Sequence, residues 1–187
     1  GGLPMSWISP ASKASSGNIR LDMQKIDLVE LGLQAGAEFE DKFAAKGLEL
    51  CMDAPEHPVY ILADGRHLWR VLENLYNNAA KYSMEHTRIY ADILEQDGKG
   101  IFTLKNISAN KLNISPDELT ERFVRGDASR STDGSGLGLS IAKSLASLQG
   151  GELVIEIDGD LYKANVIFPL YEEPAAEPEE EEATTTT

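Results

Sequence analysis

The sequence has a single cysteine, Cys51, and no long apolar run. One cysteine cannot form an internal disulfide or a cysteine-based zinc site, which favours a reducing compartment. No stretch approaches the roughly 18 to 20 apolar residues that a membrane helix needs, and the start does not resemble a signal peptide. We therefore expect a soluble, cytoplasmic domain that makes no direct membrane contact.

Basic residues are also scarce. The 187 residues include 17 Lys and Arg against 31 Asp and Glu, a formal net charge of −14. Such a chain repels nucleic-acid phosphates, so no nucleic-acid partner is expected. Length and composition predict a folded domain at 27–170, preceded at 1–26 by a linker or a remnant of an upstream helical region. The glutamate-rich segment 171–187 has little apolar surface and is predicted to be a disordered acidic tail.

Local patterns predict helices alternating with short strands. Long helices are expected over 27–47 (capped by Asp27), 64–82 (capped by Asp64) and 138–149 (ended by Gly150), with a short helix over 115–123. Strands are expected over 48–52, 59–62, 87–95, 101–107, 152–157 and 162–168, the last four forming hairpins through Asp97-Gly98 and Asp158-Gly159. The sum is an α+β two-layer sandwich: a mixed, mostly antiparallel sheet covered on one face by three helices, with one long glycine-rich loop.

The predicted helix over 64–82 carries a polar stripe beside its apolar one. Asn74, Asn78 and Lys81 cluster about 100° from the stripe that contains Leu68 and Leu75. An amide oxygen can ligate Mg²⁺, and an ammonium group can neutralise phosphate. Each asparagine destabilises a helix by roughly 0.5 kcal/mol relative to Ala. Helix stability therefore does not explain why asparagine is frequent in this helix. The stripe is either a ligand-binding face or a solvated helix surface.

A glycine-rich stretch runs directly into the third long helix. It reads Gly134-Ser135-Gly136-Leu137-Gly138-Leu139, and its unhindered backbone N–H groups suit a phosphate chain at a helix N-terminus. It is not a Walker A loop, because no Gly-Lys-Ser/Thr follows. Arg122, Arg125 and Arg130 precede it, and they either clamp a γ-phosphate or form surface salt bridges.

Three ordered blocks resemble the catalytic, ATP-binding domain of sensor histidine kinases, within the wider family shared with gyrase, heat-shock-90 and mismatch-repair ATPases. Residues 72–83 resemble the N box, residues 121–130 the F box and lid, and residues 134–139 the second glycine box. The resemblance covers about Asp27 to Pro169. It implies a Bergerat-type fold with a long ATP lid, and ATP and Mg²⁺ as cofactors.

The resemblance also implies roles for single residues. Asn78 would hold Mg²⁺ against the ATP phosphates, with Asn74 beside it, Lys81 on phosphate and Tyr82 near the nucleotide. The phosphates would be lined from the lid side by Gly134, Ser135, Gly136, Leu137, Gly138 and Leu139, with Arg125 and Arg130 nearby. The ATPase branches place a water-activating glutamate where this chain has Asn74. An amide is no general base, so the γ-phosphate should survive for transfer, and Glu73 is the nearest substitute base.

The sequence departs from the family pattern in three places. The first glycine box, Asp-x-Gly-x-Gly, is missing, and Asn106 stands where its aspartate would be. The amide oxygen of Asn106 can still accept a hydrogen bond from the adenine 6-amino group. The final Gly-Thr element is not evident at 162–165, and none of His57, His67 and His86 lies in a phospho-acceptor motif.

These observations predict the catalytic domain of a longer kinase, with any sensor and membrane segment upstream. It would bind Mg·ATP and transfer the γ-phosphoryl group to a histidine on a separate dimerisation domain of the same parent kinase, with a response regulator downstream. Two alternatives remain open. One is a protein serine kinase of the anti-sigma type, and the other is a degenerate nucleotide-binding or interaction module without turnover.

Overall fold

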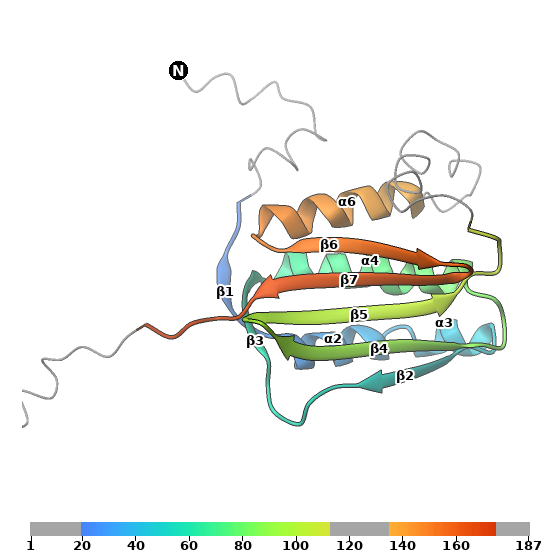
Figure 1. Ribbon diagram of the computed structural model, residues 1–187, viewed down its shortest axis with the longest axis horizontal. Coiled ribbons are helices and arrows are strands. Elements are labelled where there is room, and N and C mark those ends of the chain that lie inside the picture. The colour runs from blue at the N-terminus through green and yellow to red at the C-terminus, as the bar shows by residue number, and fades with distance from the viewer. Residues whose placement is uncertain (1–19, 113–134, 175–187) are drawn as a thin grey trace, which may run out of the picture.

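The computed structural model describes residues 20–112 and 135–174, and of 135–137 the backbone only. Capping residues and glycine turns divide these residues into short elements (Figure 1). In chain order they are β1 (Met23–Asp27), α2 (Leu28–Ala37), α3 (Glu40–Ala45), β2 (Glu49–Asp53), β3 (Tyr60–Asp64), α4 (Gly65–Tyr82), β4 (Arg88–Gln96), β5 (Lys99–Ile107), α6 (Ser135–Leu148), β6 (Glu152–Asp158) and β7 (Leu161–Pro169).

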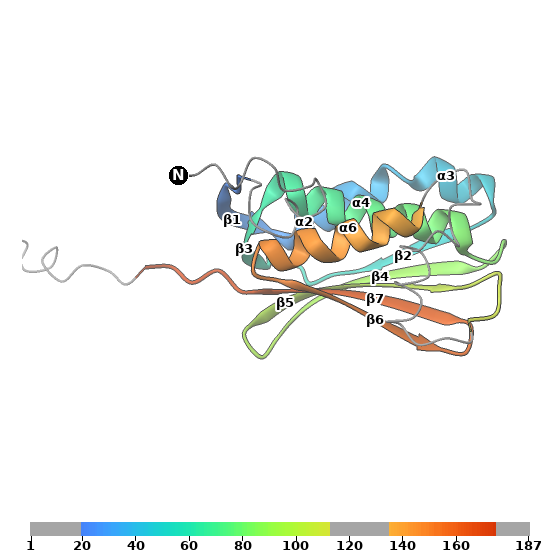
Figure 2. The same ribbon diagram turned by 90° about the horizontal axis from the view of Figure 1, so that it is seen from above.

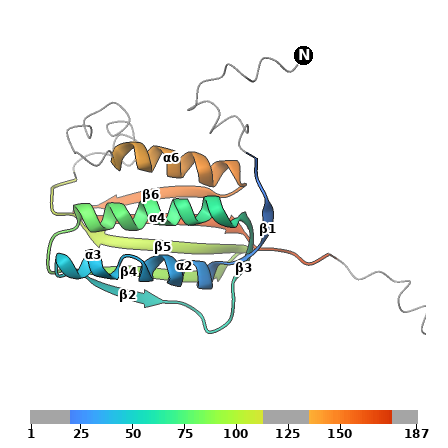
Figure 3. The same ribbon diagram turned by 180° about the vertical axis from the view of Figure 1, so that it is seen from behind.

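The main sheet has five strands in the order β2-β4-β5-β7-β6. β2 pairs with β4 in parallel, and the other three pairings are antiparallel. Helices α2, α4 and α6 lie on one face of this sheet (Figure 2), with α4 between the other two (Figure 3). The predicted two-layer α+β arrangement is therefore confirmed.

The predicted strands and hairpin turns are also confirmed, with end shifts of one or two residues. Asp97 and Gly98 have φ values of 52° and 75°, the left-handed pair that a two-residue hairpin turn requires. Gly159, in the β6–β7 turn, has a φ of 63°, and Gly150 ends α6 with a φ of 88°.

An aromatic cluster fills the space between α4 and the sheet. Tyr76 of α4 is fully buried, and its ring centroid lies 5.7 Å from that of Phe39 and 5.8 Å from that of Phe102. Burial raises the pKa of Tyr76, whose hydroxyl donates to the Gly32 carbonyl oxygen at 3.3 Å. Each such side chain contributes roughly 1.5–3 kcal/mol through burial, so α4 is anchored firmly against the sheet.

The helix predicted over 27–47 is in fact two helices. The backbone leaves the α-helical region at Phe39, with φ −104° and ψ 3°, and α3 starts afresh at Glu40. Phe39 is only 7% exposed, and it stacks on Tyr76 beside Phe43. The break therefore accompanies burial of both phenylalanines on one tyrosine, which the helical periodicity did not reveal.

Residues 23–27 form a strand, although the sequence placed 23–26 in a linker. β1 pairs antiparallel with β3, from Met23 opposite Asp64 to Asp27 opposite Tyr60. Asp27 also caps α2, as predicted, because its Oδ1 accepts from Val29 N at 3.0 Å. The boundary expected after residue 26 thus falls inside a paired strand.

The described residues after β7 continue along the other edge of β3. Tyr171 N donates to the Tyr60 carbonyl oxygen at 2.8 Å, and Lys25 Nζ lies 2.5 Å from Glu173 Oε2. The rest of the predicted acidic tail, the lid and the short helix over 115–123 lie outside the described residues. Within 20–112 and 135–174, no helix is long and apolar enough to cross a membrane.

Candidate functional site

A pocket of about 170 Å³ opens beside the C-terminal half of α4. Its floor is formed by the end of β5 and the start of β7, and the segment after β5 forms one wall. The lining combines flat aromatic and aliphatic surfaces with a few polar groups, which suits a small organic ligand. The lining residues are Asn78, Tyr82, Asn106, Ser108, Asn110, Leu112 and Tyr162.

Backbone contacts hold the end of α4 beside this floor. Ser83 caps α4, with its Oγ donating to the Ala79 carbonyl oxygen at 2.6 Å, and it forms an isolated β-bridge with Ser108. Ala109 N donates to the Tyr82 carbonyl oxygen at 2.9 Å. These contacts place Tyr82 next to the segment that follows β5, so the pocket wall has a defined position.

Asn78 lies at the border between the apolar and polar stripes of α4. Leu75 and Ala79 beside it are buried in the core, and Asn78 itself is only 8% exposed while lining the pocket. A nearly buried amide without a structural hydrogen bond in the described part of the chain is available to a ligand. Its carbonyl oxygen is the type of ligand that Mg²⁺ accepts.

Asn74 connects α4 with the glycine-rich start of α6. Its Nδ2 donates to the Gly138 carbonyl oxygen at 3.2 Å, and a Cβ on Gly138 would lie 3.7 Å from Asn74 Cγ. The fully buried Leu139 anchors α6 at this level. The structure thus brings together two blocks that are far apart in the sequence, the asparagine face of α4 and the glycine stretch.

Asn106 and Tyr162 are direct neighbours across the β5–β7 pairing and form the floor of the pocket. Asn106 is 5% exposed. The Tyr162 hydroxyl oxygen is buried and has no hydrogen-bond partner among the described residues. Burial raises the pKa of this phenol, so it is a neutral donor.

Sequence reasoning missed Tyr162. The signal was present only in part: Tyr162 alternates with Ala164 and Val166, which face the helices and are buried. The alternation of residues along β7 therefore predicts that Tyr162 lies on the helix-covered face of the sheet. Its place opposite Asn106 follows only from the pairing of two strands that are distant in the chain.

Other predicted site residues lie elsewhere. Lys81 borders a second hollow, of about 530 Å³, together with Lys42, Lys46 and Asn77, and it is not among the residues that line the first pocket. Glu73 is exposed.

The glycine block is only partly covered by the structure. The helix predicted from 138 begins at Ser135, so Ser135, Gly136 and Leu137 form the first turn of α6. Arg122, Arg125, Arg130 and Gly134 lie outside the described residues.

The arrangement of pocket, asparagine helix and glycine-rich helix start has counterparts in known proteins. The family model described as "Histidine kinase-, DNA gyrase B-, and HSP90-like ATPase" matches residues 63–187. The chain belongs to this ATPase family.

Two curated relatives are named as sensor proteins. The chain is 31% identical over 151 residues to the probable sensor protein PcoS of Escherichia coli, covering 79% of this chain and 32% of that protein. It is 32% identical over 156 residues to the sensor protein VanS of Enterococcus faecium, covering 81% of this chain and 39% of that protein. The chain therefore spans about a third of the length of these relatives.

Solved structures of histidine kinases share the fold. The catalytic domain of histidine kinase ThkA has a TM-score of 0.68 at 23% identity, covering 80% of this chain and 96% of that chain. Full-length ShkA in complex with AMPPNP has a TM-score of 0.70 at 24% identity, covering 88% of this chain and 35% of that chain. The predicted resemblance to the ATP-binding catalytic domain of sensor histidine kinases is thus confirmed.

Proposed function

We propose that this domain binds ATP with Mg²⁺ in the pocket beside α4 and transfers the γ-phosphoryl group to a histidine on a dimerisation domain of its parent kinase. The observation that carries the proposal is the double role of α4: its Asn78 lines the pocket with Asn106, and its Asn74, one turn earlier, contacts the glycine-rich start of α6. We further propose that a response regulator receives the phosphoryl group and that the reaction takes place in the cytoplasm, where ATP is abundant.

The described residues fit a magnesium nucleotide. The pocket offers apolar walls for a base, a nearly buried amide at Asn78 and an unsatisfied hydroxyl at Tyr162. The Asn78 amide oxygen would hold Mg²⁺, and the backbone around Gly138 would lie along the phosphates. When bound, Mg²⁺ neutralises charge on the phosphate oxygens. Arg125 and Arg130 would supply further positive charge against the phosphates, while Lys81 borders the second hollow and would act on them only from outside the pocket.

The residues near the phosphates favour transfer over hydrolysis. The Asn74 amide is held by the Gly138 carbonyl oxygen and has no proton-accepting carboxylate. Glu73, the nearest carboxylate on α4, is exposed and does not line the pocket. Water near the γ-phosphate would therefore not be activated from this position, and the phosphoryl group would remain available to an incoming imidazole.

Two neighbouring asparagines allow a matched test. Asn78→Ala removes the proposed magnesium ligand, whereas Asn77→Ala removes an amide that accepts from Lys42 Nζ at 3.3 Å outside the pocket. Calorimetric titration with a non-hydrolysable ATP analogue should show binding that Mg²⁺ strengthens. The Asn78 variant should lose roughly 10- to 100-fold in affinity with Mg²⁺, the range expected for lost contacts to a charged group, and the Asn77 variant should not.

Phosphotransfer is measured separately, with radiolabelled ATP and the purified histidine-containing domain of the parent kinase. Label should appear on the histidine with the unaltered domain and with the Asn77 variant, and be lost with the Asn78 variant. Binding without any transfer would contradict the kinase proposal and favour a module without turnover. Equal loss in both variants would contradict the role of Asn78.

A further inference from the structure

The hydroxyl of Tyr162 is a buried polar group of the pocket without a hydrogen-bond partner among the described residues. Its oxygen is shielded from solvent, and no group in 20–112 or 135–174 forms a hydrogen bond with it. A buried hydroxyl normally has a partner, because leaving it unpaired loses the hydrogen bonds that water would have supplied. In a pocket wall, such a group indicates a contact that a ligand completes.

The position of Tyr162 indicates which part of a ligand it meets. It lies directly opposite Asn106 in the β5–β7 register, on the pocket floor, while Leu112 and the Tyr82 ring contribute apolar walls. Two hydrogen-bonding groups at the base of an apolar pocket suit a flat heterocycle with polar edges. The glycine-rich helix start, which suits phosphates, meets α4 at Asn74, a residue that does not line this pocket.

We propose that Tyr162 is a nucleobase-binding residue whose hydroxyl donates to a ring nitrogen of the purine, beside an Asn106 amide that binds the exocyclic group. The inference rests on the proposed function, because it assumes that a nucleotide occupies the pocket. The Asn106 amide and the Tyr162 hydroxyl are two neutral groups on neighbouring strands. Together they would take the place of the single aspartate carboxylate of the first glycine box. Base recognition would then depend on hydrogen-bond geometry and not on a carboxylate.

Tyr162→Phe tests this assignment because it removes one oxygen and keeps the ring. Since the hydroxyl has no partner among the described residues of the ligand-free protein, the melting temperature without ligand should stay the same or rise. Affinity for a non-hydrolysable ATP analogue should fall about 2- to 12-fold, the range for one lost hydrogen bond. Tyr60→Phe is the matched control, because Tyr60 is 40% exposed on β3 and lies outside the pocket, and both quantities should stay unchanged.

Inorganic tripolyphosphate separates base binding from phosphate binding. The Tyr162 variant should bind tripolyphosphate as the unaltered protein does, while its affinity for the ATP analogue falls. Equal loss for both ligands, unchanged affinity for the ATP analogue, or a melting temperature lowered by several degrees without ligand would each overturn the assignment. If the unaltered protein bound no nucleotide at all, the proposed function itself would be wrong.

Discussion

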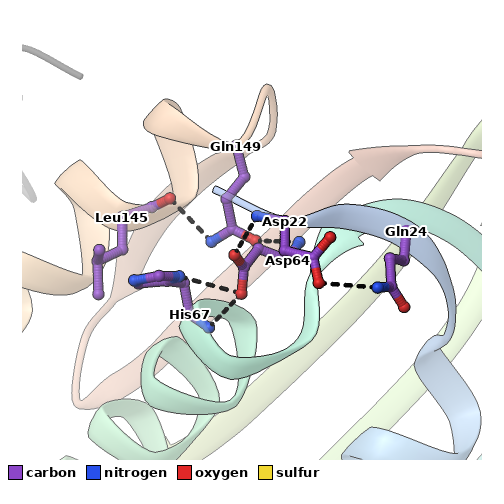
Figure 4. A network of polar contacts seen from close by, with 6 residues as sticks. All are labelled: Asp22, Gln24, Asp64, His67, Leu145 and Gln149. Atoms are coloured by element: carbon purple, nitrogen blue, oxygen red, sulfur yellow. Dashed lines mark hydrogen bonds and ion pairs between the residues drawn. The ribbon is translucent and has the colours of Figure 1, made fainter. Parts of the chain in front are cut away.

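At its N-terminal end, α4 begins among buried polar groups that hydrogen-bond to one another (Figure 4). Asp64 Oδ2 accepts from Asp22 N at 2.8 Å, and Asp64 Oδ1 accepts from His67 N at 3.1 Å and lies 3.0 Å from His67 Nδ1. Gln149 of the segment after α6 accepts from Asp64 N at 2.9 Å and donates to the Leu145 carbonyl oxygen at 2.9 Å. These contacts join β1, β3, α4 and α6.

The pocket end of the same helix is organised differently. Asn78 is nearly buried without a structural hydrogen bond in the described residues, and the hydroxyl of Tyr162, which lines the same pocket, has no hydrogen-bond partner there. Both ends bury polar groups, and Ser83 is used within the fold at the pocket end, but the Asn78 amide and the Tyr162 hydroxyl make no such contact among the described residues. We infer that the N-terminal end of α4 serves mainly stability and the C-terminal end mainly ligand binding. A mutation at the first end should change the free energy of unfolding far more than ligand affinity, and one at the second end should do the opposite.

Asp64→Ala should have the largest effect. It removes the α4 cap and leaves the Asp22 and His67 amides without their acceptor, so the free energy of unfolding should fall by about 2–4 kcal/mol. Urea denaturation measures this change. Asp53→Ala, at an exposed position on β2, should change it by less than about 0.5 kcal/mol. Nucleotide affinity of the folded Asp64 variant should stay within about twofold, and a larger loss would break the proposed separation.

Gln149→Leu isolates the contact between α6 and the start of α4. The variant keeps the volume but leaves Asp64 N without its acceptor, which should cost about 1–3 kcal/mol in urea denaturation. The exposed Gln96→Leu at the end of β4 is the control, with an effect close to zero. An equally small effect at Gln149 would show that the network contributes little to stability.

Acid should weaken the N-terminal network specifically. Burial alone would raise the pKa of Asp64, but the hydrogen bonds from Asp22 N and His67 N and the imidazole of His67 lower it overall below 3.8. The stabilising effect of this charge is therefore complete above about pH 4 and is lost as the pH falls through the folded-state pKa. Denaturation of the native protein and of Asp64→Asn at pH 5 and pH 3 should give a smaller difference in the free energy of unfolding at pH 3. A gap that widens toward pH 3 would contradict this sign.

Gly138→Ala should have the smallest effect on stability and the opposite sign. A Cβ there would lie 3.7 Å from Asn74, an ordinary contact, and alanine should stabilise α6 by about 0.5–1 kcal/mol. The added methyl group would stand where we expect the phosphates, so affinity for an ATP analogue should fall. The exposed Ser147→Ala on the same helix should leave the affinity unchanged. If Gly138→Ala left the affinity for the ATP analogue unchanged, the phosphates would not lie against this turn.

Local chemistry made much of the fold predictable. Asp64 begins α4, Asp97 and Gly98 form the hairpin turn, and Gly150 ends α6 as expected, because each depends on its immediate neighbours. β1 was missed because its pairing with β3 depends on residues far along the chain. The break at Phe39 was missed because it depends on the position of Tyr76.

The candidate site was likewise predictable where it depends on neighbours along the chain, and not where it depends on distant residues. Asn74 and Asn78 were found because they lie on one helix, where spacing gives the face. Tyr162 was missed because strand alternation gives its face but not its neighbour, which only the sheet register supplies. The placement of Lys81 at a different hollow likewise depends on Lys42 of α3 and on Lys46, which follows α3, and the sequence of α4 alone does not reveal these neighbours.

The strand β3 has a mechanical consequence. β1 runs along one of its edges and residues 170–171 along the other, both antiparallel to it. The chain enters β1 beside Asp64 and leaves the other edge beside Tyr60, at opposite ends of β3. Tension between residues 22 and 172 would therefore pull along the strands and load their hydrogen bonds together in shear. Bonds loaded together resist more force than bonds opened one after another, so the domain would transmit a pull without peeling apart at its edge.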